Sequence, residues 1–307
     1  MRPFRATVWM PCVALVLGSL LVAGCADDTL TPIGDGSSTA ELREQVRYTL
    51  DAGPHQGAVP DSIDLRADVL MQSVDSARTL VTVSLRDTLH TPRIYPVYLR
   101  ANSADTTGPV LQPLGAIDNA VQPAGQSRHL VPRPLDSLRV LDAHITIHEQ
   151  AMPRDTVLAR GNVGANASAQ PTLFQLERPT PAATATYPLG PVANGRSEVP
   201  GGIAGTIRFE ALSPARTLVE VRRTDAGPST TRAHPVHLRI GLAGAGGDIA
   251  FYLGALDGTA PPPASSWAVV PRAFDALVAF DGHVRVSWSN ETLETVLGAG
   301  NIGANAP

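Results

Sequence analysis

The chain has 307 residues, and its 24 basic residues, all arginine, are outnumbered by 28 acidic ones, which gives a formal net charge of −4. This balance provides no basic surface of the kind that binds nucleic acid, so no nucleic-acid partner is expected. After residue 25 no apolar run approaches the ~20 residues that a membrane-spanning helix needs.

Residues 1–24 have the pattern of a secretory signal peptide. Arg2 and Arg5 supply a positive start, and the segment from Val8 to Val22 is largely apolar. The small pair Ala23-Gly24 then precedes Cys25. This order of a charged, an apolar and a small-residue region is typical of exported proteins.

A cysteine directly after the small residues resembles the bacterial lipobox, which implies lipidation of Cys25 and a mature chain that begins there. Two acyl chains satisfy the two-signal requirement for stable anchoring. The alternative is an ordinary signal peptide with a chance cysteine. Ala26 stands where an aspartate would resemble an inner-membrane retention signal, so the resemblance implies a lipid anchor in the outer membrane. Cys12 lies within the signal, and the mature protein is therefore expected to lack disulfides.

The remaining sequence repeats itself in one ungapped register. The offset is 139 residues, the separation of Tyr95 from His234. Five blocks share it: Tyr95–Arg100 with His234–Arg239, Leu114–Asp118 with Leu253–Asp257, Val131–Arg133 with Val270–Arg272, Asp142–His144 with Asp281–His283, and Gly161–Asn166 with Gly300–Asn305. We therefore expect a flexible tether in 25–46, one domain in 47–167, a linker in 168–186 and a second domain in 187–307.

Short alternating runs predict β-strands in both copies. Leu80–Leu85 places Val81, Val83 and Leu85 on one face. The same alternation recurs at Ile145 and Ile147, Ile207 and Phe209, Val219 and Val221, and Val284, Val286 and Trp288. Leu135, Leu138 and Leu141, like Phe274, Leu277 and Phe280, follow a three-residue spacing that predicts a short helix or turn. Such strands, separated by turn residues, predict an all-β protein of two tandem antiparallel β-sandwiches.

Ordered blocks in the second copy resemble the CHRD (chordin-like) family, which occurs in bacterial secreted proteins and lipoproteins. The blocks are His234–Leu238, Gly247–Leu253, Leu256–Gly258, Phe280–Val286 and Gly300–Asn305. The resemblance implies Greek-key sandwiches of the immunoglobulin-like or Cu,Zn-superoxide-dismutase-like kind. It implies no settled activity.

The family's His-x-His strand resembles the copper-binding strand of Cu,Zn superoxide dismutases. The second copy keeps His237 but has Arg239 at the other position, and the first copy has Tyr98 and Arg100. An arginine cannot lose its proton to become a ligand, so no metal or other cofactor is expected. A copper or zinc site that pairs His237 with His283 remains an alternative. The competing interpretation makes both histidines outward-facing polar strand residues.

No catalytic constellation is apparent. Gly298–Gly303 matches the GxGxxG dinucleotide pattern but has no room for the helix that this pattern requires.

Exposed aromatic residues at Tyr252, Trp267 and Trp288 would form a surface for a polysaccharide or protein partner, although aromatic residues more often fill cores. The sequence thus predicts a lipid-anchored cell-envelope protein that is a non-enzymatic binding or structural module. The alternative is a metal-binding or redox-related domain of dismutase-like descent.

Overall fold

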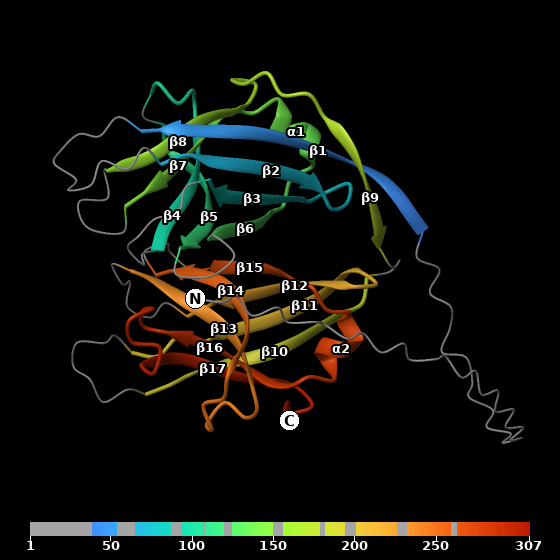
Figure 1. The fold of residues 1–307 in the computed structure, drawn as a ribbon, viewed down its shortest axis with the longest axis vertical. Coiled ribbons are helices and arrows are strands. Elements are labelled where there is room, and N and C mark those ends of the chain that lie inside the picture. Colours follow the sequence, from blue (N-terminus) through green and yellow to red (C-terminus); the bar gives the residue numbers. More distant parts are fainter. Residues whose placement is uncertain are drawn as a thin grey trace, which may run out of the picture. The chain divides into compact units, whose positions relative to one another are not determined.

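A computed structural model describes residues 39–53, 65–86, 94–106, 108–119, 125–149, 156–178, 182–193, 201–225, 232–258 and 263–307. Within these ranges nearly all regular structure is β-strand (Figure 1). Gly36–Pro307 form one compact unit. Cys25 and the predicted signal peptide lie outside the described residues. In the described ranges, no helix combines the length and apolarity needed to cross a membrane.

The described strands form two antiparallel sheets, one of nine strands and one of eight. The first contains β1 (Thr39–Ala52), β2 (Ala67–Ser73), β3 (Thr79–Leu85), β4 (Ile94–Ala101), β5 (Val110–Asp118), β6 (Gln126–Val131), β7 (Asp142–His148), β8 (Val157–Gly164) and β9 (Thr172–Arg178). The second contains β10 (Thr184–Pro191), β11 (Gly205–Ser213), β12 (Arg216–Arg223), β13 (Ala233–Ile240), β14 (Ile249–Asp257), β15 (Ala264–Val270), β16 (Asp281–Ser287) and β17 (Val296–Gly303). Helices α1 (Leu135–Arg139) and α2 (Phe274–Val278) precede β7 and β16.

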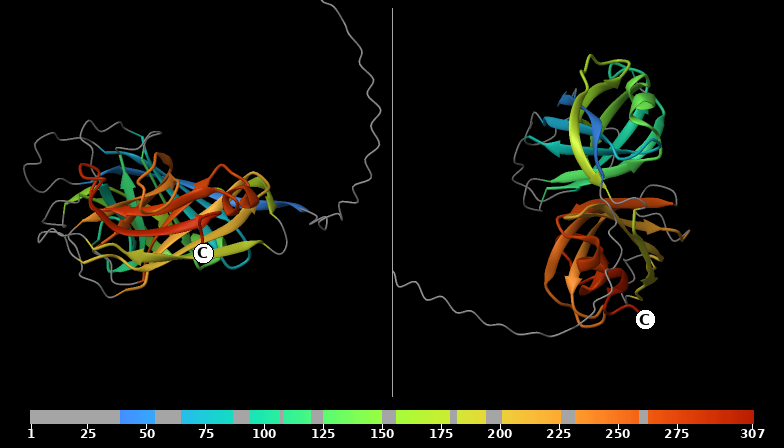
Figure 2. Two further views of the ribbon diagram at one scale, coloured as in Figure 1. Left: turned by 90° about the horizontal axis from the view of Figure 1, so that it is seen from below. Right: turned by 90° about the vertical axis from the view of Figure 1, so that its right-hand side faces the viewer.

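Apart from β9, the two sheets repeat each other strand for strand. The first follows the order β5-β4-β7-β8-β1-β2-β3-β6, and the second follows β14-β13-β16-β17-β10-β11-β12-β15. These orders correspond under the same 139-residue offset, and β4 and β13, for example, begin and end at equivalent residues. The prediction of an all-β chain with two antiparallel domains is confirmed at this level, and each sheet is barrel-like (Figure 2).

A serine joins the two end strands of each sheet. The Ser127 hydroxyl on β6 donates to the Leu114 carbonyl on β5, and the Ser266 hydroxyl on β15 donates to the Leu253 carbonyl on β14 at 2.7 Å. Gly254 beside this contact has φ +89°, and a Cβ there would lie 2.8 Å from the Ser266 hydroxyl oxygen. Glycine is therefore required at this position for both conformation and space.

Each sheet encloses its own hydrophobic core, and the predicted alternation accounts for it. The inward residues that share a face include Val81, Val83, Ile145 and Ile147 in the first core, and Ile207, Phe209, Val284 and Val286 in the second. The three-residue spacing correctly predicted the short helices. Leu135 and Leu138 of α1 and Leu277 of α2 are buried against these cores.

Strand structure extends into both segments that were expected to be connections. β1 begins at Thr39, inside the expected tether, and its first half pairs with β9 from Thr39↔Arg178 to Gln45↔Thr172 (Figure 1). β9 itself lies inside the expected linker. Leu176 on β9 is buried, so this part of the chain contributes packing as well as backbone hydrogen bonds.

Equivalent residues of the two repeats meet each other. Ile94 and Ala116 form one small buried cluster with Ala233 and Ala255, which are their counterparts in the second repeat. β5 lies against β14, and β6 lies against β15. The contact therefore has the self-complementary character of a two-fold interface, although both halves belong to one chain.

A buried ion-pair network also connects the repeats. The Glu210 carboxylate on β11 accepts two hydrogen bonds from Arg78, at 2.7 and 3.0 Å, and another from Arg178. Arg208 lies 3.1 Å from the same carboxylate, and Asp75 pairs with both Arg78 and Arg178. The side chain of Glu210 is only 4 % exposed, so this acid depends on its arginine partners.

Candidate functional site

A cavity at the contact between the repeats has a volume of about 610 Å³. We call it the aromatic crevice. Its lining includes Gln126 and Arg128 from β6, Arg216 from β12, Phe251 and Tyr252 from β14, and Trp267 from β15. Volumes of this size accommodate small organic ligands, and a lining of aromatic residues with a few hydrogen-bonding groups is typical of such sites.

Strand alternation positions the aromatic residues of β14. Phe251 packs against the second core, whereas Tyr252 is 44 % exposed. Tyr252 lies opposite His237 of β13, and their rings meet edge to face with centroids 5.0 Å apart. The neighbouring strand thus fixes the ring of Tyr252 while one side of it remains accessible.

Only two of the three predicted surface aromatics line this cavity. Trp267 lines the crevice but is 9 % exposed, because it packs in an apolar cluster with Leu130 and Leu218. Trp288 does not line the crevice. It stacks on His234 with centroids 5.4 Å apart, and the Arg232 guanidinium lies 5.5 Å from its ring centre. Trp288 therefore belongs to a separate part of the second domain.

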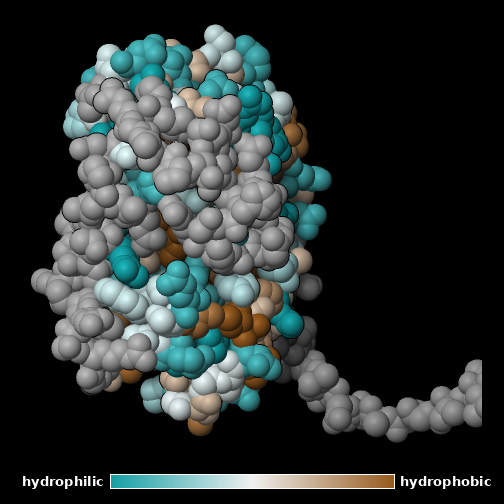
Figure 3. Space-filling model, turned by 60° about the vertical axis from the view of Figure 1, so that its left-hand side comes forward, coloured by the Kyte–Doolittle hydropathy of each residue, from teal (hydrophilic) through white to brown (hydrophobic). Residues whose placement is uncertain are grey.

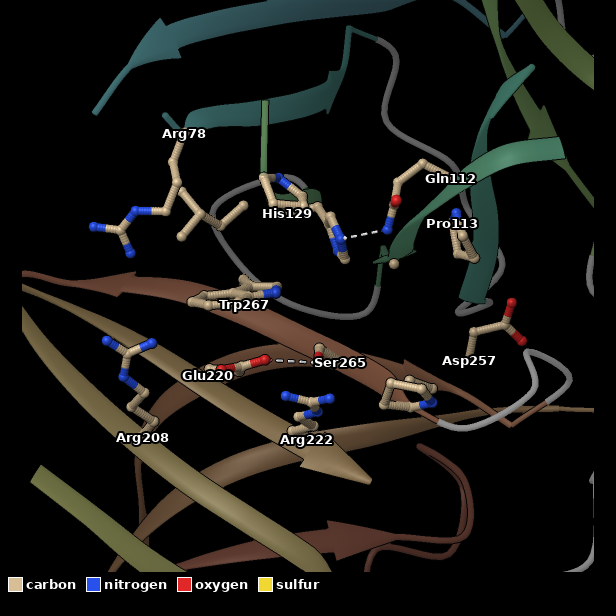
Figure 4. Close-up of a pocket in the computed structure, with 15 residues that line it drawn as sticks. Arg78, Gln112, Pro113, His129, Arg208, Glu220, Arg222, Asp257, Ser265 and Trp267 are labelled. Carbon is tan, nitrogen blue, oxygen red and sulfur yellow. Dashed lines mark hydrogen bonds between the residues drawn. The ribbon is translucent and has the colours of Figure 1, made fainter. Parts of the chain in front are cut away.

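A second cavity, of about 350 Å³, shares Trp267 with the aromatic crevice and is shown in Figure 4. We call it the polar crevice. Gln112 and His129 face it from the first domain, and Glu220, Arg222 and Ser265 face it from the second. The amide of Gln112 lies 3.1 Å from His129, and Ser265 donates to Glu220 at 2.8 Å. Burial lowers the pKa of His129 to about 4.

The two crevices are equivalent sites with different linings. Under the 139-residue offset, Gln112, Pro113 and His129 of the polar crevice correspond to Phe251, Tyr252 and Ala268 of the aromatic crevice. The two-fold contact thus creates two related hollows, and only the second repeat supplies aromatic side chains. Sequence reasoning missed both crevices because they arise from the contact between repeats. The substitution of aromatic for polar residues at equivalent positions was the available signal.

The predicted histidine pair lies on adjacent strands, β13 and β16. His237 faces Arg285 across the strands, and His283 faces Arg239. These four residues, which we call the basic cluster, occupy the sheet face opposite to the core residues Leu238 and Val284. Their side chains therefore lie on the face away from that core, but His237 and His283 are only 1 % and 0 % exposed and are not surface residues.

A loop after β13 covers part of the basic cluster. His283 Nδ1 lies 2.7 Å from the Gly241 carbonyl oxygen, and Arg239 Nη1 donates to the Gly247 carbonyl at 2.9 Å. Burial, together with the charges of Arg239 and Arg285, lowers the pKa of His237 to about 4. Burial also lowers the pKa of His283.

The cluster is poorly suited to a metal cation. Two guanidinium groups alternate with the two imidazoles, and their positive charge disfavours a divalent ion. Over the described ranges, no group of three or more His, Cys, Asp or Glu side chains is placed to hold a metal.

Hydrophobic side chains also form small patches among hydrophilic ones on one face of the molecule (Figure 3).

No family model matches this chain, and neither a curated protein nor a solved structure shows significant similarity to it. The function therefore has to be inferred from the residues themselves.

Proposed function

We propose that this chain is a lipid-anchored protein of the bacterial outer membrane whose two CHRD-like domains form a non-enzymatic module that binds polysaccharide. Cys25, in its lipobox-like setting, is the proposed anchor. The aromatic crevice is the proposed binding site, and this crevice is the observation that carries the proposal.

Three features of the crevice favour a sugar chain over a flat protein surface. The site is concave, with a volume of about 610 Å³. The exposed ring of Tyr252 offers an apolar face on which the C–H face of a sugar ring can stack. Arg128, Arg216 and Gln126 place guanidinium and amide groups around the same cavity, where they can bind sugar hydroxyls.

The resemblance to bacterial CHRD lipoproteins supports the location and the Greek-key, immunoglobulin-like or dismutase-like sandwich. Trp267 lines both the crevice and the contact between repeats. Ligand binding therefore depends on both domains together.

The test is retention of the full-length lipoprotein, purified in detergent, on polysaccharides extracted from its own envelope. Tyr252→Ala should weaken binding by roughly threefold to tenfold, the equivalent of one aromatic contact. Leu42→Ala is the matched control, because Leu42 is an apolar side chain that is 68 % exposed on β1, away from the crevice. Retention equal in both variants, or no retention of the wild type, would rule out the proposal.

A further inference from the structure

The basic cluster carries an electrostatic imbalance. His237, Arg239, His283 and Arg285 are 1, 6, 0 and 7 % exposed, respectively. Adjacent strands are about 4.8 Å apart, and alternate residues along a strand are about 7 Å apart. Four nitrogen-bearing side chains therefore start from a patch of roughly 5 by 7 Å on one sheet face.

Little negative charge compensates the two guanidinium groups. Arg285 Nη1 lies 3.5 Å from a carboxylate oxygen of Glu294, but the Glu294 side chain is 83 % exposed. Arg239 has the Gly247 carbonyl as its hydrogen-bond acceptor. Burying a guanidinium without a counter-charge costs several kcal/mol, so the cluster is incomplete as an ion-pair arrangement.

Several buried nitrogens also lack hydrogen-bond partners among the described residues. They are Nε of Arg239, Nε of Arg285, Nδ1 of His237 and Nε2 of His283. Buried polar atoms are almost always satisfied in folded proteins. Such a set of atoms, gathered on one face, is best explained by a ligand that satisfies them together.

We propose that the basic cluster binds a phosphate group, either inorganic phosphate or a phosphate monoester. The guanidinium N–H groups of Arg239 and Arg285 would donate to the phosphate oxygens, which arginine recognises well. If His283 donates from Nδ1 to Gly241, its Nε2 carries a lone pair and needs a donor. Hydrogen phosphate, or a phosphate monoester bound as its monoanion, has both acceptor oxygens and one P–O–H donor and so meets both demands, whereas sulfate and acetate offer no donor at neutral pH.

The first repeat provides an internal comparison. Arg100 and His144 are the counterparts of Arg239 and His283, and they make the same contacts, to the carbonyls of Gly108 at 3.0 Å and Asn102 at 2.8 Å. Thr146 stands where the second repeat has Arg285, and Tyr98 stands where it has His237. The first repeat thus keeps the fold and the loop contacts but has only one guanidinium, so the phosphate site is confined to the second repeat.

This inference goes beyond the proposed polysaccharide function and does not depend on it. Tyr252 separates the two sites, because its ring contacts His237 on one side and lines the aromatic crevice on the other. A failed sugar-binding test would leave the phosphate site untouched, and the reverse also holds.

The experiment is calorimetric titration of the full-length protein with inorganic phosphate, glucose 1-phosphate, sulfate and acetate at constant ionic strength. We expect saturable binding of one phosphate per chain. The same binding by glucose 1-phosphate, lost together with phosphate binding in Arg285→Thr, would show that the site admits a monoester, and exclusion of it would identify the free ion. Sulfate and acetate should bind more weakly.

Arg285→Thr introduces the residue that the first repeat uses at this position, so the variant should fold. Loss of one charged hydrogen-bonding group should weaken phosphate binding roughly tenfold or more. Arg100→Gln is the matched control and should bind phosphate like the wild type. Phosphate should also raise the pKa of His237, which its imidazole proton resonances report without any variant. Absence of saturable phosphate binding, or equal binding by Arg285→Thr and the wild type, would overturn the proposal.

Discussion

Removal of the Glu210 carboxylate should weaken the link between the two repeats. In Glu210→Ala, Arg78 and Arg178 lose their shared buried partner while Asp75 still pairs with both. Breaking a buried ion pair costs about 3–5 kcal/mol. The arginine side chains are 23 % and 15 % exposed, so solvent offsets part of this cost. We expect a loss of roughly 2–3 kcal/mol in the free energy of unfolding.

Urea unfolding at pH 7 measures this loss. Glu44→Gln is the matched control, because Glu44 and Arg139 form an ion pair at 3.3 Å in which both side chains are at least 32 % exposed. Such surface pairs contribute about 0–1 kcal/mol. If Glu210→Ala cost no more than Glu44→Gln, the assignment of Glu210 as the ionic link between repeats would be refuted.

Three further predictions concern pH and backbone conformation. Burial disfavours ionisation of Asp75 and Glu210, but the hydrogen bonds and charges around them, those of Arg78 first, together outweigh it, lowering the pKa of Glu210 and bringing the pKa of Asp75 to about 2. Their stabilisation is therefore complete above the ordinary carboxyl pKa of about 4 and should be lost as the pH falls below it, which acid titration of the unfolding midpoint measures. Burial lowers the pKa of His129 to about 4, so its neutral form contributes stability above pH ~6.5 that declines between pH ~6.5 and 4. The total is roughly 3 kcal/mol, and His129→Gln should flatten this part of the profile, whereas an unchanged profile would contradict it. Gly254→Ala should lower the free energy of unfolding by roughly 1–3 kcal/mol, because Gly254 has a positive φ and lies next to the Ser266 hydroxyl. Gly201→Ala should not lower it, because a new Cβ there meets nothing within 4 Å. Thermal unfolding of both variants distinguishes these outcomes.

Much of the fold could be predicted because local pattern and repeat agree. The alternation of Val81 and Val83 reflects one buried face, and the offset between Tyr95 and His234 carries each strand assignment into the second copy. β9 was missed because its surroundings are rich in Pro, Thr and Ala. The alternation within Thr172–Arg178 is short, and it becomes a strand only by pairing with β1.

The sites were harder to predict because they depend on contacts between distant segments. The sequence offered His237 and His283 as a possible pair, but their burial depends on the loop that returns through Gly241 and Gly247. Likewise, Tyr252 and Trp267 share a cavity only because the two repeats meet around equivalent strands. The sequence therefore predicted which residues share a face of a strand, but not how exposed their side chains are or which distant residues share a cavity.

The fluorescence of Trp267 gives the most direct test of the proposed function. The chain has three tryptophans, of which Trp9 lies in the proposed signal peptide, so a Trp288→Phe variant leaves Trp267 as the single one in the proposed mature protein. Titration of this mature lipoprotein variant with envelope polysaccharide should change its emission saturably, with a midpoint that matches the affinity measured by retention. Retention of polysaccharide without any change in Trp267 emission would contradict binding in the aromatic crevice.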